Sequence, residues 1–481
     1  MSRLVPGPSP LPLLGPLGNM LWFRRDPLRC SERLFRTYGS LVGLVDGAAS
    51  ARARRPLSVV FATGAELNRE ILTQHDRYKT YALSGQFFPG KNVTPRTRPL
   101  LRMLTGLFHV NGDEHRRHRH LLMPSFHKAR IESYRDDMVR LTEEMLAGFT
   151  PGRVIDLSAE VTRLTLRVAT QTLFGDDVGE AGMQVASWLQ EWLSVMFQPG
   201  MYLRSDRPFL PYRRWLDRTH QIDRAMADIV TRKRQRGGAG RDMLSMLLAA
   251  RDEHGVALSD DELIGHVSVI FAAGHETSAN ALQWILFLLS QHPQVAGELV
   301  EELRGELRGE APTTEQLARL PFLDAVVREA LRVLPPVPLY PRYISEPCEL
   351  QGYALPRGTV IFLSMYHLHH DPGLYPSPQA FVPRRFLRSK PGPFEYNPFG
   401  AGPRMCIGAA FATLELKIAL ALILQRVRIA IVPSSEQGFR VAITMAPRPG
   451  LRARLHPPDG RWAEDAGGIR GGVRELVDLP L

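Results

Sequence analysis

The spacing of apolar residues predicts a mainly helical chain with a few short strands. Helical periodicity dominates from about residue 110 to 335, and another helix is expected after Gly408. Two β-branched runs, at 41–45 and 57–62, are typical of a hairpin. Proline and glycine are frequent between 336 and 400, which favours irregular chain with short strands. The pattern therefore indicates a mainly α fold with small β-sheets.

The longest helix is predicted for residues 262–290. Ser259 and Glu262 have the spacing of a capping box, which marks a helix start. About 30 helical residues span roughly 45 Å, enough to cross a whole domain. Polar residues such as Glu276 and Asn280 interrupt the segment and leave no uncharged stretch of about 18 residues that could span a membrane. We therefore expect a long helix in the protein core.

One large domain is expected, because no internal repeat or interdomain linker is found. Residues 1–20 form a Pro/Gly-rich lead-in, 21–455 the domain itself, and 456–481 a loosely ordered tail rich in glycine and charge. The prolines of the lead-in break any apolar helix that could act as a signal peptide or transmembrane anchor. Three cysteines without a pairing pattern fit a reducing compartment, so a cytoplasmic location is expected.

The net charge of +11 does not by itself predict nucleic-acid binding. All but six of the 60 basic residues are arginines scattered along the chain, and no nucleic-acid module accompanies them. The densest basic run, 232–236, leads into glycines and is typical of a solvated loop. A docking surface for an acidic protein is the alternative, and no nucleic-acid partner is expected.

The segment from Phe399 to Gly408, FGAGPRMCIG, carries the most chemical information. It places the thiol of Cys406 on a glycine-rich turn before a helix, whose N-terminal N–H groups favour thiolate over thiol. Arg404 could pair with an acidic group on a ligand. Taken alone, Cys406 would more often be an unreactive core cysteine.

These ten residues match in full the haem-binding signature Phe-x-x-Gly-x-Arg-x-Cys-x-Gly, so the chain resembles the cytochrome P-450 superfamily of haem-thiolate monooxygenases, and its soluble bacterial members in particular. The resemblance implies a single domain that encloses haem b between the long central helix and the cysteine loop. Cys406 would be the thiolate ligand of the iron, with Phe399 and Gly408 also at the cofactor.

A second similarity to the family lies ahead of the cysteine. Glu329 and Arg332 spell Glu-x-x-Arg, and Arg385 matches the arginine of the family's Pro-Glu-Arg-Phe motif. Arg384 stands where that motif has glutamate, which is a departure from the pattern. The resemblance implies a structural triad in which one carboxylate is shared by two guanidinium groups.

The middle of the long helix resembles the family's oxygen-activation motif. Gly274 would leave room for a diatomic ligand, Thr277 would hydrogen-bond bound oxygen, and Glu276 would relay protons. A plain polar break in a helix is the alternative for such a lone threonine.

Four cationic or polar residues match the family's positions for holding the haem propionates. They are His115, Arg119, Arg342 and Arg404. As bare sequence, the run 112–120 could equally be a basic helix face, a metal cluster or a nucleic-acid stripe. Its histidines are not spaced for one helical face, so zinc is not expected.

Substrate contacts are expected from loop regions, and a plain core role remains the alternative for each. The candidates are Phe87, Phe88, Ala272, Ala273, Val337, Leu339, Ile443 and Met445. A second aromatic and apolar set could line an entrance or belong to the core: Trp188, Trp192, Phe197, Met201, Tyr202 and Phe209. Their apolar character favours a hydrophobic substrate such as a fatty acid, terpene, steroid or polyketide-like molecule.

The resemblance implies an enzyme that uses O₂ and two electrons to hydroxylate or epoxidise this substrate. No flavin- or ferredoxin-like segment is found, so electrons from NAD(P)H would arrive through a separate ferredoxin or flavodoxin and its reductase. Two alternatives stay open. One is a haem-thiolate peroxygenase or isomerase, and the other is a non-catalytic haem- or ligand-binding protein.

Overall fold

The structure, a computed structural model, describes residues 3–11, 13–47, 59–80, 94–175, 179–196, 201, 205–236, 240–432 and 436–480. Its α-helices are α1 (Pro16–Arg25), α2 (Pro27–Tyr38), α4 (Ala65–Thr73), α6 (Arg98–Met103), α7 (Gly112–Leu122), α8 (Lys128–Ser133), α9 (Arg135–Ala147), α10 (Leu157–Phe174), α11 (Gly179–Met196), α12 (Pro211–Gln235), α13 (Met243–Ala249), α14 (Asp260–Gln291), α15 (Pro293–Leu307), α16 (Thr314–Ala318), α17 (Pro321–Val333), α18 (Met365–His369), α19 (Arg385–Arg388) and α20 (Ala409–Arg426).

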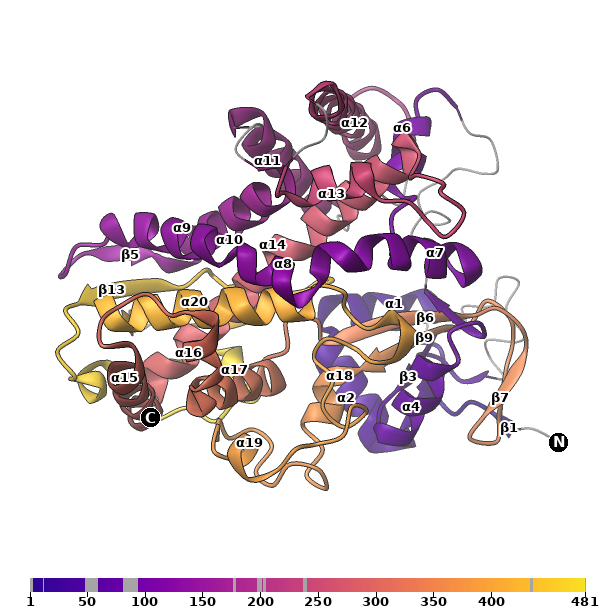
Figure 1. Ribbon diagram of the computed structural model, residues 1–481. Helices are drawn as coiled ribbons and strands as arrows, with labels where there is room; N and C mark the ends of the chain where they lie inside the picture. Colours follow the sequence, from indigo (N-terminus) through magenta and orange to yellow (C-terminus); the bar gives the residue numbers. More distant parts are fainter. Residues whose placement is uncertain are drawn as a thin grey trace.

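The long helix α14 lies at the centre of the molecule (Figure 1). Its start is fixed by the expected capping box, in which the Ser259 hydroxyl accepts from the Glu262 N–H and the Glu262 carboxylate accepts from the Ser259 N–H at 2.7 Å. The helix packs against α10, α12, α17 and α20. Residues 278–291 of the helix are all buried, and within them the run Trp284–Leu289 is apolar on every side, as is typical of a helix that is covered all round.

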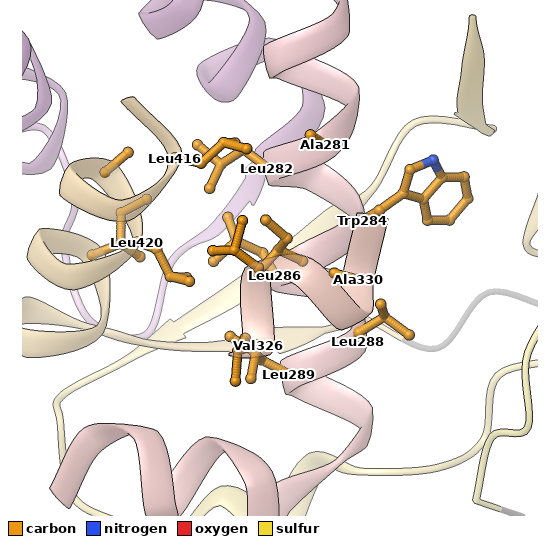
Figure 2. Close-up of a cluster of buried hydrophobic side chains, with 14 of the residues drawn as sticks. Ala281, Leu282, Trp284, Leu286, Leu288, Leu289, Val326, Ala330, Leu416 and Leu420 are labelled. Carbon is orange, nitrogen blue, oxygen red and sulfur yellow. The ribbon is translucent and has the colours of Figure 1, made fainter. Parts of the chain in front are cut away.

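One part of the main core lies where α14 packs against α17 and α20 (Figure 2). Leucines of α14 meet α17 and α20, and the labelled side chains include Leu282, Leu286, Leu289, Val326, Ala330, Leu416 and Leu420. Each buried leucine contributes about 1.5–3 kcal/mol relative to exposure. This packing holds the segment before α20, which carries the cysteine, in a fixed position against α14.

The strands form small sheets at the side and end of the helical body. The largest has the order β2 (Leu41–Gly43), β3 (Val59–Ala62), β9 (Val360–Ser364), β6 (Leu339–Ile344) and β4 (Tyr78–Thr80), with β3 and β9 parallel and the other neighbours antiparallel. The remaining sheets are β1 (Arg3–Leu4) with β8 (Tyr353–Leu355) and β7 (Cys348–Leu350), β10 (Arg428–Ile431) with β13 (Arg452–His456) and β5 (Val154–Asp156), and β11 (Gly438–Val441) with β12 (Met445–Arg448). The predicted mainly α fold with small sheets is confirmed, and the two predicted hairpin runs supply β2 and β3.

The C-terminal segment differs from the loosely ordered tail expected from its sequence. Its apolar side chains are buried in the main core: Trp462, Ile469, Val473, Leu476 and Val477. Two 3₁₀ turns, η5 (Trp462–Asp465) and η6 (Gly472–Glu475), shape it. The physical reason is that a few apolar side chains can hold a segment rich in glycine and charge when they are buried against the apolar surface of the rest of the protein.

In the part of the chain that the structure describes, no helix combines the length and the apolar character needed to span a membrane.

Candidate active site

Cys406 lies in the loop between the 3₁₀ turn η4 (Gly402–Arg404) and α20, and its side chain faces the main cavity. The Cys406 N–H donates to the Phe399 carbonyl at 2.9 Å, which closes the loop. Gly400 and Gly402 have φ values of 71° and 70°, a region that favours glycine. A Cβ atom at Gly402 would overlap the carbonyl oxygen of Leu72. The glycines of the motif are therefore required by the backbone of this loop.

The electrostatic environment of the thiol differs from the sequence expectation. Burial raises the pKa of Cys406 above its ordinary value, and this outweighs the Gly408 N–H and the positive charge of Arg119, which lower it. The following helix begins at Ala409, two residues later than the expected start near Ile407, and Gly408, whose N–H acts on the sulfur, is its N-cap. A thiolate at Cys406 would therefore require a bound metal ion, because metal coordination deprotonates a thiol.

Three arginines gather at the same cavity without a counter-charge. Arg119 on α7, Arg342 on β6 and Arg404 on η4 all line it, and among the described residues their hydrogen bonds go to backbone carbonyls and to the Asn111 side chain, with no ion pair to a carboxylate. Burial lowers the pKa of Arg342 to about 10, and burial with the neighbouring guanidinium groups lowers that of Arg404 to about 10. The Nε of Arg404 has no hydrogen-bond partner in the described chain. Buried cations without an anion fit a dianionic ligand, such as the two propionates of a haem.

His115 completes this cluster one helical turn before Arg119. It is buried, and its Nδ1 has no partner among the described residues. Burial and the charges of Arg404 and Arg119 lower the pKa of His115 to about 3, so the imidazole is neutral near pH 7. A neutral imidazole can still donate one hydrogen bond to a carboxylate. The residues around the cavity thus fit a flat, dianionic, sulfur-ligated haem.

The oxygen-activation stretch of α14 lines the opposite wall of the same cavity. Gly274 has no atom within 4 Å of the position that a Cβ would take, so the space beside it is open. The Thr277 hydroxyl donates to the Ala273 carbonyl at 2.7 Å, and the Glu276 carboxylate accepts from the Thr444 hydroxyl at 2.6 Å. The two polar side chains are therefore held by separate partners, and both line the cavity.

Glu329, Arg332 and Arg385 come together away from the cavity. The Glu329 carboxylate accepts from Arg332 twice at 2.8 Å and from Arg385 Nε at 3.0 Å, and the side chains of Glu329 and Arg332 are 0% exposed. Arg332 also donates to three backbone carbonyls, those of His369, Pro378 and Ala380. The cluster ties α17 to the segment before the cysteine loop. Arg384, the departure from the family motif, instead pairs with Glu298 on the surface at 2.6 Å.

The cavity has a volume of about 2060 Å³ and takes in most of the expected substrate residues. Ala272, Ala273, Val337, Leu339 and Ile443 line it, as does Trp192 from the second set. Phe87, Phe88, Phe197 and Tyr202 lie outside the described residues.

Met445 does not reach the cavity. It is 0% exposed, and its backbone N–H donates to Pro336 while its carbonyl accepts from the Trp284 indole at 3.0 Å. The alternation of side chains along β12 directs it into the core, which the sequence pattern of so short a strand could not indicate. Of the entrance candidates, Met201 is buried in the second core cluster, Trp188 stacks with Arg218, and Phe209 is exposed.

Three residues at the site were missed by sequence reasoning. Asn111 accepts from Arg404 through its side chain at 2.8 Å, Thr444 holds Glu276, and the Tyr340 hydroxyl donates to the Pro398 carbonyl beside the cysteine loop at 2.7 Å. None belongs to a motif. Of the three, only Tyr340 could have been found from the sequence, because it lies two residues before Arg342 and therefore on the same face of a strand.

Comparison with known proteins gives consistent results. A family model described as cytochrome P450 matches residues 5–450. The chain is 34% identical to cyclooctatin synthase of Streptomyces melanosporofaciens, over 95% of this chain and 94% of that protein. It is 32% identical to cyclooctat-9-en-7-ol 5-monooxygenase of the same organism, over 90% of each. Among solved structures, retinoic acid-bound cyanobacterial CYP120A1 superposes with a TM-score of 0.79 at 26% identity, covering 95% of this chain and 100% of that chain.

The fold and the cysteine loop facing a cavity define a haem-thiolate class of protein, and the chain belongs to the cytochrome P450 family. It is an oxidoreductase of the monooxygenase kind, in a family that uses haem-thiolate iron and O₂. The resemblance seen in the sequence is confirmed.

Proposed function

We propose that this protein uses O₂ and two electrons to hydroxylate or epoxidise an apolar, terpene-like molecule, with Cys406 as the thiolate ligand of haem b. The observation that carries the proposal is one cavity shared by the Cys406 side chain, by three arginines that have no ion-pair partner among the described residues, and by the Gly274–Thr277 stretch of α14. Bound haem would supply the iron at which dioxygen is activated.

The protein's own contribution begins with binding and orientation. Arg119, Arg342 and Arg404, with His115, would hold the two propionates, and the Cys406 sulfur would hold the iron. The negative charges of the two propionates would offset the positive charges of the arginines and so relieve the repulsion among the guanidinium groups. Cofactor binding and burial of the arginines would therefore support each other. Phe399 and Gly408, which both line the cavity, would pack at the cofactor near the sulfur.

Proton delivery is the second contribution. Glu276 would take a proton from solvent, and its carboxylate is oriented by the Thr444 hydroxyl. The Thr277 hydroxyl donates to its own helix at Ala273, so its oxygen lone pairs remain available as an acceptor on the cavity side. Glu276 would thus release its proton toward the cavity, and Thr277 Oγ1 would accept a hydrogen bond from the group that receives this proton.

Two observations support a terpene-like substrate. The cavity wall that could receive it carries apolar side chains, among them Leu104, Val269, Val337 and Leu339. The relatives at 32–34% identity are named for cyclooctatin and cyclooctat-9-en-7-ol, which are terpene products. Titration of haem-loaded protein with terpene hydrocarbons and alcohols should displace the water ligand and shift the Soret band, whereas straight-chain fatty acids should shift it less.

Electrons are proposed to come from NAD(P)H through a separate ferredoxin or flavodoxin and its reductase. If docking of an acidic partner is electrostatic, the rate of reduction should fall as salt rises. A salt-independent rate would contradict this part of the proposal. Turnover supported by the redox partners should also exceed turnover with peroxide alone, and the reverse result would favour a peroxygenase.

The central experiment tests the sulfur. The reduced protein with carbon monoxide should show the far-red-displaced Soret band that only thiolate-ligated haem produces. Cys406→Ala should abolish this band, whereas Cys348→Ala, a cysteine paired with the Tyr78 hydroxyl away from the cavity, should leave it unchanged. Retention of the band in Cys406→Ala would overturn the proposed function.

A further inference from the structure

The C-terminal segment takes part in the wall of the main cavity. Gly472 and Glu475 of η6 line it together with Arg29 of α2 and Phe439 of β11. Met20 and Phe23 of α1, a helix that contacts α2, line the same cavity. Residues 456–480 lie beyond the region 5–450 that the family model matches.

A two-pronged ion pair joins two of these cavity-lining residues. Arg29 Nε donates to Glu475 Oε2 at 2.8 Å, and the Arg29 Nη2 donates to Glu475 Oε1. The side chains are 62% and 46% exposed, so solvent reaches the pair from outside while both residues line the cavity within. Exposed ion pairs are weak, so thermal motion opens such a pair readily.

The arginine is held at a helix terminus. Asp26 caps α2 by accepting from the Arg29 N–H at 3.1 Å, which places Arg29 in the first turn. A cation is unfavourable there, because the helix N-terminus is itself partly positive. The carboxylate of Glu475 is therefore a suitable partner for the guanidinium, together with the Asp26 carboxylate, which lies 3.7 Å from Arg29 Nε.

The glutamate is presented by a firmly anchored segment. Val473 N–H donates to the Gln437 carbonyl at 3.1 Å, and Gln437 N–H donates to the Arg470 carbonyl at 2.8 Å. Gly471 has a φ of 98°, and a Cβ there would lie 2.7 Å from the Gln437 carbonyl oxygen. Val473 and Val477 are buried on either side of Glu475. Opening therefore needs only the ion pair to break, and the backbone can stay in place.

We propose that the Arg29–Glu475 ion pair is a gate at one mouth of the substrate cavity, and that the segment 471–475 forms one side of that mouth. This inference rests on the proposed function in that the cavity is taken to receive the substrate. The cavity that the pair lines also carries the aromatic side chains of Phe23, Phe362 and Phe439, and the pair itself is exposed and therefore weak. An apolar molecule can pass once the pair opens.

A gate has a kinetic signature that a purely structural ion pair lacks. Weakening it raises the association and dissociation rate constants of a bulky ligand by the same factor and leaves the dissociation constant unchanged, because the bound state is not altered. From the strength of exposed ion pairs, the expected factor is about two to five. Salt should speed entry in the wild type for the same reason, and this effect should be lost in a variant without the pair.

The experiment uses haem-loaded protein and phenylimidazole as an iron-ligating probe, followed by stopped-flow absorbance in the Soret region. Glu475→Gln and Arg29→Gln should each raise both rate constants about two- to fivefold. The charge-swapped double variant Arg29→Glu/Glu475→Arg should return toward the wild-type rates. Carbon monoxide, which is small enough to pass a closed gate, should bind at the wild-type rate throughout.

Glu306→Gln is the matched control, because it breaks an ion pair of similar exposure with Arg319 whose partners do not line the cavity. Its rate constants should equal those of the wild type. The gate is refuted if Glu475→Gln binds phenylimidazole at the wild-type rates, or if it changes the dissociation constant in place of the two rates. The carbon monoxide band, recorded on the same samples, reports the thiolate ligation separately, so failure of the gate is distinguished from failure of the proposed function.

Discussion

Glu415 should make the protein less stable as the pH rises. This glutamate on α20 is 3% exposed, and its carboxyl oxygens make no hydrogen bond of ordinary geometry within the described chain. Burial raises the pKa of Glu415 to about 8, an increase that the nearby Ser278 hydroxyl only partly offsets. The folded protein therefore keeps a proton on Glu415 at neutral pH, whereas the unfolded chain does not.

The sign and size of the effect follow from proton linkage. Below the unfolded pKa, about 4.3, both states carry the proton and the stability is unaffected. Between that value and the folded pKa, the folded state binds one proton more than the unfolded state, so the free energy of unfolding falls by about 1.4 kcal/mol per pH unit. Over the full window the loss from this one group is about 5 kcal/mol.

Glu415→Gln removes the ionisation while it keeps the size of the side chain. The variant should match the wild type near pH 4 and should be more stable by several kcal/mol near pH 9, as measured by urea unfolding followed by circular dichroism on equally haem-loaded samples. Glu301→Gln, at an exposed position on α15, is the control and should show no such divergence. A stability difference between Glu415→Gln and the wild type that stays constant across this range would refute the reasoning.

Two further predictions concern the arginine clusters. Glu329→Ala leaves Arg332 buried without its counter-charge and should cost about 3–5 kcal/mol of unfolding free energy. Glu298→Ala, which breaks the exposed pair with Arg384, should cost at most about 1 kcal/mol. Equal losses in urea titrations would contradict the buried triad. Arg342→Leu should weaken haem binding about 10- to 100-fold, measured as faster haem transfer to an excess of apomyoglobin, yet should not destabilise the haem-free protein, since it removes one of three mutually repelling cations. Unchanged haem loss would argue against Arg342 as a propionate ligand.

The motifs of the sequence led to much of the site because they encode local geometry. The positive φ angles of Gly400 and Gly402 are a backbone requirement that a sequence displays directly as glycine. The capping box at Ser259 located the start of α14 in the same way, because its two hydrogen bonds join residues only three positions apart. In such cases the interacting atoms are neighbours in the chain.

Long-range partners were not accessible in this way. Thr444 and Glu276 are hydrogen-bonded although 168 residues apart in the sequence, and Asn111 and Arg404 although 293 residues apart. No periodicity or motif predicts either contact. The tail was expected to be loosely ordered because its composition is rich in glycine and charge. Whether a few apolar residues such as Val473 and Val477 are buried depends on a surface that other parts of the chain must first build.

The sequence by itself determined the family, the mainly helical fold and the cysteine that faces the cavity, because each is written in residues that lie close together or recur with a regular period. Only the tertiary structure decided that burial outweighs the helix terminus at the Cys406 thiol, that three distant arginines share one cavity where the described residues offer them no carboxylate, and that the C-terminal segment lines the same cavity. These properties depend on desolvation and on distances between segments, and both are fixed only when the chain has folded.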